Sequence, residues 1–260
     1  MAERVIVVGA GLAGLAVAAE LGPHAEVELV ERLPAAGGTW GFDAPAVRDL
    51  VRRCAAVGVR MTLGVTALRW VDRRLLLVGP GTRCWRAADH LIFAGGTRPA
   101  TAAELPLFGA RVAGVFAGTV AHHLLEARIA LGRQIAVCGA GYWAGLALAE
   151  LPPGARATVV GGDVAPGGPV VAAWPGYAPR EVRGRDRVEQ LVIERDGHRH
   201  ALDCDCVVLA GDQRPIRNVD GAITPVPDVT YVQLCADTLT PGAVVDHAVA
   251  AAALHGRNIG

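Results

Sequence analysis

Three glycines close to the N-terminus have the spacing of a phosphate-binding turn. Gly9, Gly11 and Gly14 form G-x-G-x-x-G between an apolar run, residues 4–8, and an Ala- and Leu-rich segment that predicts a helix. In this setting the first glycine makes the tight turn, the second lets the backbone approach a pyrophosphate, and the third lets helix and strand pack closely. The helix N-terminus then presents free N–H groups to the phosphates.

An acid stands where such a site needs one. Glu31 ends the second predicted strand, residues 26–30, and follows Gly9 by about 20 residues, where a carboxylate accepts hydrogen bonds from ribose hydroxyls. G-x-G-x-x-G alone would also fit an α/β turn that binds no phosphate. The full order of strand, glycines, helix, strand and acid predicts a dinucleotide site.

The same plan returns in the middle of the chain. A predicted strand begins at Gln134, and Gly139, Gly141 and Ala144 then form G-x-G-x-x-A before a helix that extends to about Leu151. This second copy predicts a second Rossmann unit.

The end of the second copy is different. Its next strand, residues 155–160, runs into Gly161-Gly162 where an acid is expected, and Asp163 comes slightly late. No arginine stands there to meet a 2′-phosphate. The adenosine half of the second site is therefore incomplete, and the pattern leaves open whether it holds a nucleotide.

A closing segment is also repeated. Residues 88–99 and 204–215 share, without a gap, the pattern Asp-x-three apolar-Ala-Gly-x-x-Arg-Pro. Each follows a predicted β-hairpin, at 67–71 with 75–78 and at 188–194 with 200–203. The repeat predicts two related βαβ domains, each with a short antiparallel insertion, followed by a tail with a strand at 229–234 and a helix at 243–254.

Composition excludes several classes of protein. The chain contains no lysine, so it has no P-loop lysine and no lysine that could form a Schiff base. It also contains no serine, so it is not a serine hydrolase. Basic and acidic residues both number 25, which gives no electrostatic case for binding nucleic acid or an anionic membrane. We expect no leader and no membrane span, and we expect a cytoplasmic protein with reduced thiols.

Cysteines and histidines offer few sites. The cysteines show no C-x-x-C pair and no zinc spacing, and alternation on a strand would place Cys204 and Cys206 on one face as buried apolar residues rather than redox or cluster thiols. His122-His123 could serve as an acid/base pair or as metal ligands. With no carboxylate at metal spacing we interpret them as a pair at a helix end that faces solvent or the first domain, and we expect no metal. No general base stands out, so the catalytic residues stay undetermined.

The order of these pieces resembles the two-dinucleotide-domain FAD/NAD(P) flavoproteins of the pyridine nucleotide-disulfide oxidoreductase superfamily. The resemblance covers nearly the whole chain. It implies an α/β fold with two Rossmann-like three-layer ββα/βαβ domains, the second inserted into the first. By that likeness residues 1–106 plus 218–260 form a discontinuous FAD-binding domain, and residues 107–217 form a compact NAD(P)-type domain.

The resemblance also implies site residues. Those that would hold FAD are Gly9, Gly11, Gly14, Glu31, Arg32, Gly38, Thr39, Trp40, Ala94, Gly95, Gly96 and Asp237. Gly139, Gly141 and Ala144 would hold NAD(P) or another adenine nucleotide if the second site is occupied. Trp40 could cover the flavin or simply pack, and Tyr142 could close over a nicotinamide or fill an empty site.

Departures from the family pattern narrow the function. The redox-active cysteine pair is missing, which argues against a disulfide reductase, and Leu146 stands where nicotinamide-binding members usually carry a Glu. A subgroup fits better: the FAD/NAD-type subunits of hydrogen cyanide synthase, opine oxidase and the proline or hydroxyproline dehydrogenase complexes. The stretches at 107–119 and 182–189 look like theirs.

This subgroup implies a subunit of a multi-subunit amine or amino-acid dehydrogenase that relays electrons through bound FAD. Its partners would be a second flavoprotein dehydrogenase subunit and a [2Fe-2S] protein. One alternative is a stand-alone NAD(P)H-dependent FAD reductase of an electron-carrier protein. A second alternative is a non-catalytic scaffold subunit with a vestigial nucleotide site.

Overall fold

The computed structural model describes residues 2–216, 229–232 and 241–256. The chain divides into two compact units. The first unit comprises Met1–Thr97 and Pro215–Gly260, and the second comprises Arg98–Arg214. The first unit is therefore built from two separate stretches of chain, and the second unit lies between them in the sequence.

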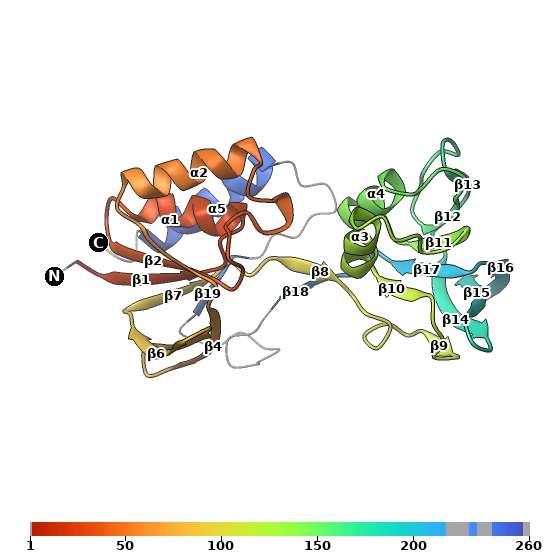
Figure 1. The fold of residues 1–260 in the computed structure, drawn as a ribbon, viewed down its shortest axis with the longest axis horizontal. Coiled ribbons are helices and arrows are strands. Elements are labelled where there is room, and N and C mark those ends of the chain that lie inside the picture. The colour runs from red at the N-terminus through yellow and green to blue at the C-terminus, as the bar shows by residue number, and fades with distance from the viewer. Residues whose placement is uncertain (1, 217–228, 233–240, 257–260) are drawn as a thin grey trace. The chain divides into compact units, whose positions relative to one another are not determined.

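A parallel five-stranded sheet forms the centre of the first unit (Figure 1). Its order is β19-β7-β1-β2-β3, with β1 (Arg4–Val8), β2 (Glu26–Glu31), β3 (Arg60–Leu63), β7 (His90–Phe93) and β19 (Val229–Tyr231). One face is covered by α1 (Leu12–Leu21), α2 (Pro45–Ala56) and α5 (Pro241–Gly256), and a short 3-10 helix, η1 (Gly38–Trp40), precedes α2. The other face carries an antiparallel sheet of β4 (Thr66–Val71), β5 (Arg74–Gly79) and β6 (Thr82–Ala87).

Strand β1 explains why residues 4–8 form a nearly continuous apolar run. Val5 and Val7 belong to the hydrophobic cluster under the helices, whereas Ile6 and Val8 belong to the cluster under the antiparallel sheet. Successive side chains of a strand point to opposite faces. A central parallel strand that is covered on both sides therefore needs an apolar residue at each of these positions.

The second unit is built in the same way. Its parallel sheet has the order β10-β17-β11-β12-β13, with β10 (Val115–Ala117), β11 (Gln134–Cys138), β12 (Arg156–Gly161), β13 (Val170–Pro175) and β17 (Cys206–Leu209). One face packs against α3 (Gly118–Glu126) and α4 (Tyr142–Ala149). The other packs against a sheet of β9 (Phe108–Gly109), β14 (Ala178–Gly184), β15 (Val188–Arg195) and β16 (His198–Asp203). Strands β8 (Thr97–Pro99) and β18 (Gln213–Pro215) form a separate pair.

No helix in the described ranges is long and apolar enough to span a bilayer.

The two parallel sheets repeat one arrangement. The order β7-β1-β2-β3 in the first corresponds to β17-β11-β12-β13 in the second. Register matches as well, since Val8 lies opposite Val30 and Cys138 lies opposite Val160. Only the fifth strand differs in origin: β19 comes after its sheet in the sequence, whereas β10 comes before its sheet. The predicted α/β class with two Rossmann-like three-layer domains is confirmed.

Both predicted β-hairpins are present, and each carries a further strand that we did not predict. β4 pairs with β5 and β15 pairs with β16, both antiparallel. The second hairpin turns at Asp196 and Gly197, whose φ angles of +50° and +81° suit a two-residue primed turn. The additional strands are β6 and β14. β6 escaped prediction because it is an edge strand with mostly exposed side chains, so it lacks apolar alternation.

An aspartate in each closing repeat holds the start of the strand that precedes the glycine turn of its unit. Asp89 accepts the backbone N–H of Arg4 at 2.9 Å, and Asp205 accepts those of Arg133 and Gln134, also at 2.9 Å. The hydrogen bond from Arg4 lowers the pKa of the Asp89 carboxyl, because only the carboxylate form accepts it fully. The same contact thus joins β7 to β1 and β17 to β11.

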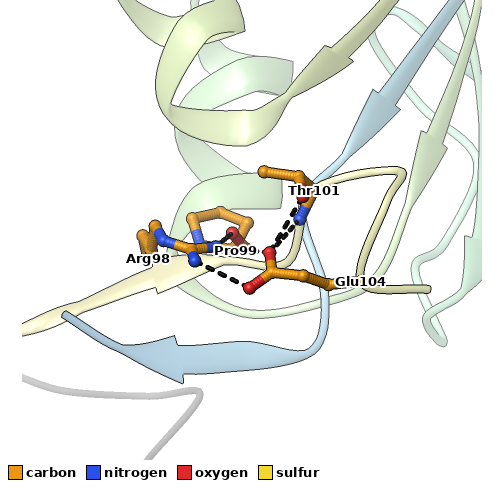
Figure 2. Close-up of polar contacts among 4 residues, drawn as sticks. All are labelled: Arg98, Pro99, Thr101 and Glu104. Atoms are coloured by element: carbon orange, nitrogen blue, oxygen red, sulfur yellow. Dashed lines mark hydrogen bonds and ion pairs between the residues drawn. The ribbon is translucent and has the colours of Figure 1, made fainter. Parts of the chain in front are cut away.

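Arg98, the arginine of the first closing repeat, lies in β8 and holds the loop that follows this strand. Both terminal nitrogens of Arg98 donate to Glu104 at 2.7 Å, and Thr101 donates its N–H and its hydroxyl to the same carboxylate at 2.9 Å (Figure 2). Arg98 also reaches the carbonyl of Pro99 at 3.1 Å. These donors hold the pKa of the Glu104 carboxyl well below its usual range. The ion pair therefore closes the loop at residues 98–104.

Replacing Asp205 with alanine should destabilise the second unit, because two N–H groups at the start of β11 lose a charged acceptor. Hydrogen bonds to charged groups contribute about 1.5–3 kcal/mol, and at this half-buried position we expect a loss near the lower figure. Urea unfolding followed by circular dichroism measures it. The control is Asp163→Ala, at an exposed aspartate. An unfolding midpoint for Asp205→Ala equal to that of the control would contradict the assigned role.

Candidate functional site

The first glycine turn depends on close backbone packing. Gly9 has φ +103°, and its N–H donates to the carbonyl of Val30 at 2.8 Å. A Cβ on Gly9 would collide with the carbonyl oxygen of Ala94, and a Cβ on Gly14 would collide with that of Gly9. Both positions need glycine because strand β7 and helix α1 approach the turn too closely for any side chain.

Gly11 is open where its neighbours are crowded. A Cβ on Gly11 would meet no protein atom within 4 Å, and Gly11 caps α1 without any side-chain hydrogen bond. Beside it, Gly37 donates its N–H to the carbonyl of Ala10 at 2.7 Å. A Cβ added to Gly38 would lie 3.2 Å from the Cα of Gly11. The 37–41 segment therefore lies against an open helix N-terminus, which suits a pyrophosphate.

Glu31 is anchored beside this turn. The residue is only 7% exposed, and its two carboxylate oxygens accept the N–H groups of Ala10 at 2.8 Å and Leu33 at 2.9 Å. A carboxylate can accept about four hydrogen bonds, so lone pairs are left for other donors. Its place at the end of β2 lets it accept from the ribose hydroxyls of a dinucleotide held at the turn.

The other residues predicted to hold FAD differ in how far they are buried. Ala94 is buried in the cluster under the helices, and Trp40 packs against that cluster while half exposed. Gly95 is half-buried, and the exposed members are Arg32, Gly38, Thr39 and Gly96. Asp237 lies outside the described residues. The first unit thus brings the glycines, Glu31 and Ala94 together, and the binding roles themselves stay a prediction.

Alanine substitutions at Gly11 and Gly14 should separate ligand binding from folding. Gly14→Ala forces a methyl group against the Gly9 carbonyl, and overpacking costs about 1–3 kcal/mol, so thermal stability should fall. Gly11→Ala meets open space, so stability should change by less than about 0.5 kcal/mol. Its flavin affinity should fall about tenfold or more. Melting temperature and flavin content per chain measure the two effects, and identical behaviour of the variants would refute the distinction.

The second glycine turn repeats the first at its leading glycine but not at the next one, since Gly11 has φ −75° and Gly141 has φ +85°. Gly139 has φ +116° and donates its N–H to the carbonyl of Val160 at 2.8 Å. A Cβ on Gly139 would collide with the backbone of Gly211. Gly141 caps α4, and Ala144 is buried in the first turn of that helix. The residues predicted for a second nucleotide therefore form a Rossmann turn.

The strand end beside this turn carries no side chain. By strand register, Gly161 at the end of β12 takes the place that Glu31 has at the end of β2. Gly161 has φ +85°, a conformation that favours glycine, and Asp163 is exposed farther along. The second turn thus lacks the carboxylate that the first turn has.

Comparison with known proteins agrees with this geometry. The model of the NAD(P)-binding Rossmann-like domain matches residues 7–56, and no curated protein sequence matches the chain. Among solved structures, Lactococcus lactis thioredoxin reductase is 15% identical with a TM-score of 0.66, and the match covers 99% of each chain. The chain has the two-dinucleotide-domain fold of FAD/NAD(P) oxidoreductases.

Two further structures share this oxidoreductase fold. L-proline dehydrogenase from P. horikoshii is 17% identical with a TM-score of 0.62, over 99% of this chain and 56% of that chain. FprA from Mycobacterium tuberculosis, in complex with NADPH, is 16% identical with a TM-score of 0.68, over 99% of this chain and 85% of that chain. Our chain therefore spans only about half the length of the P. horikoshii chain.

The histidine pair corrects a sequence-based expectation. We expected no carboxylate at metal spacing from His122 and His123, and this is wrong. Glu126, one helical turn later on α3, has an oxygen 3.6 Å from His122 Nε2 and 3.3 Å from His123 Nδ1. Glu150, at the end of α4, lies 2.9 Å from His122 Nδ1. The i,i+4 spacing of His122 and Glu126 could have revealed the first contact, but only the packing of α3 on α4 brings Glu150 close.

The described thiols of the second unit are buried in two places. Cys138 and Cys204 belong to the cluster under the antiparallel sheet, and Cys206 belongs to the cluster under α3 and α4. We expected Cys204 and Cys206 on one face, and this is wrong because Cys204 precedes β17 and does not follow its alternation. Burial raises the pKa of both thiols to about 12, which makes them poor nucleophiles.

Thiol labelling should therefore be selective. Cys84 is half-buried, whereas the buried thiols are Cys54, Cys138, Cys204 and Cys206. Burial raises the pKa of Cys54 to about 11, so at pH 8 it holds almost no reactive thiolate. Brief alkylation with iodoacetamide, read by peptide mass spectrometry, should modify Cys84 before these four, and urea should abolish the difference. Native-state labelling of Cys204 or Cys206 as fast as Cys84 would count against this assignment.

Proposed function

We propose that the chain is an FAD-dependent oxidoreductase subunit of a multi-subunit amine or amino-acid dehydrogenase, and that it relays electrons through FAD held by the first unit. The observation that carries this proposal is the difference between the two glycine turns. The first has the anchored carboxylate of Glu31, and the second has Gly161 at the matching register. One turn is complete for a dinucleotide and the other is not.

The first unit has the donor and acceptor groups that a bound FAD needs. The open backbone at Gly11 and the N–H groups at the start of α1 would hold the pyrophosphate. Glu31, fixed by the N–H groups of Ala10 and Leu33, would accept from the adenosine ribose. FAD would supply the redox chemistry, namely reversible uptake of electrons. The protein's task is to hold and orient it.

The second unit argues against NAD(P)H as the direct electron donor. A hydrogen bond to a charged group contributes about 1.5–3 kcal/mol, so the missing carboxylate at Gly161 should weaken nicotinamide dinucleotide binding by about one to two orders of magnitude. Electrons would then come from a partner subunit that oxidises the C–N bond. We propose a second flavoprotein subunit in that role and a [2Fe-2S] protein as a further partner. The likeness to P. horikoshii L-proline dehydrogenase supports this proposal at the level of fold alone.

Anaerobic stopped-flow absorbance tests the proposal. The purified chain is mixed with NADH or NADPH and the flavin band is followed, with dithionite as the positive control for reduction. We expect a bound flavin that stays oxidised with both nucleotides, because the second turn lacks its carboxylate. Glu31→Gln provides the matched control and should lose most of its flavin, which would show that the band reports on the first unit.

Two results would overturn the proposal. Rapid bleaching by NADH or NADPH would support a stand-alone NAD(P)H-dependent reductase, for which the favourable observation is that Gly139 repeats the φ angle and the strand contact of Gly9. Absence of flavin from the parent chain would support the scaffold alternative.

A further inference from the structure

We propose that His122, His123 and Glu126 form a binding site for a divalent transition metal of the zinc type on the second unit, and that Glu150 orients His122 within it. All four residues belong to the second unit. The proposal does not depend on the proposed redox function.

Two of the three separations among the ligand atoms are close to those that zinc requires. One oxygen of Glu126 lies 3.6 Å from His122 Nε2 and 3.3 Å from His123 Nδ1. The nearest ligand atoms of the three residues all lie within 4.8 Å of one another. Tetrahedral zinc with bonds of about 2.0–2.2 Å places its ligand atoms about 3.3–3.5 Å apart. Small side-chain rotations would therefore complete the coordination.

Glu150 supplies the partner that metal-binding histidines usually have. Its carboxylate lies 2.9 Å from His122 Nδ1, so the ring can donate its Nδ1–H to Glu150. The lone pair of Nε2 then points to the side where Glu126 lies. His122 is also held by packing, since its side chain is only 12% exposed. Its ring lies edge-on to that of Trp143, with 6.1 Å between the ring centroids. The buried histidine is thus pre-oriented before any metal binds.

The opposite side of the site faces solvent. The side chains of His123 and Glu126 are 74% and 56% exposed, so a metal ion can enter without any movement of the backbone. Three protein ligands leave a fourth position for water or an external ligand. Two imidazoles and a carboxylate suit zinc and its neighbours among the first-row metals better than Mg²⁺ or Ca²⁺, which prefer an all-oxygen shell. A metal would also link α3 to α4 through His122 and Glu150.

The same contacts could exist without any metal. Histidine and glutamate at i,i+3 and i,i+4 form ordinary surface pairs on helices, worth a few tenths of a kcal/mol. Such pairs would not give the chain one strong site, and they would give Glu150 no influence on metal affinity. Metal binding and its response to Glu150 therefore distinguish the two interpretations.

The experiment uses the full chain with any affinity tag removed and metals stripped by a chelator. Zn²⁺ is titrated against a chromophoric competitor, and Co²⁺ is added separately to detect the visible absorption of a tetrahedral site. We expect one strong Zn²⁺ site per chain. His123→Ala and Glu126→Gln should each weaken binding at least tenfold, and both side chains are exposed enough to be removed without unfolding the protein.

Glu150→Gln tests the positioning role, and His198→Ala serves as the control at an exposed histidine on β16. Removal of such an orienting partner typically costs about 10–100-fold in metal affinity, so Glu150→Gln should bind zinc at least tenfold more weakly at an unchanged melting temperature. His198→Ala should bind like the parent chain. Failure of the parent chain to bind micromolar Zn²⁺, or binding that survives His123→Ala and Glu126→Gln, would overturn the site. Unchanged affinity in Glu150→Gln would overturn the role of Glu150.

Discussion

Backbone packed directly on backbone at the glycine turns is the constraint on which both units depend. In the first unit, Gly9 lies against the carbonyl of Ala94, and Gly14 lies against the carbonyl of Gly9. In the second, Gly139 lies against the backbone of Gly211. A side chain at any of these positions would push the first helix or the closing strand away from the central strand. The turn could then no longer place a helix N-terminus at the carboxyl ends of the parallel strands.

Because this constraint is shared, what separates the two units is the residue at the end of the next strand. Glu31 is anchored by two backbone N–H groups, which hold a charged acceptor beside the open position at Gly11. At the matching place in the second unit, Gly161 ends its strand with positive φ and has no side chain to offer. A duplicated fold therefore has one glycine turn with an anchored carboxylate beside it and one without.

The second unit has a cluster of histidine and glutamate side chains where α3 meets α4. His122 joins the two helices through Glu150, while Glu126 and His123 stay open to solvent. Its buried thiols are kept protonated by the loss of hydration, which leaves them as packing residues. The side-chain chemistry of this unit thus lies in imidazole and carboxylate groups on the helical face rather than in its cysteines.

Local pattern determined much of this protein without any structure. Strand, glycine turn, helix and terminal acid are neighbours in sequence, so the Rossmann units, both hairpins and the contrast between Glu31 and Gly161 could be predicted from spacing alone. Edge strand β6 could not, because exposed charged side chains give no alternation. Contacts between distant segments were also beyond reach: Asp205 on Gln134, Gly9 on Ala94, and Glu150 on His122. Only the tertiary structure decides such pairs, because packing of strands and helices, and not spacing along the chain, sets which side chains meet.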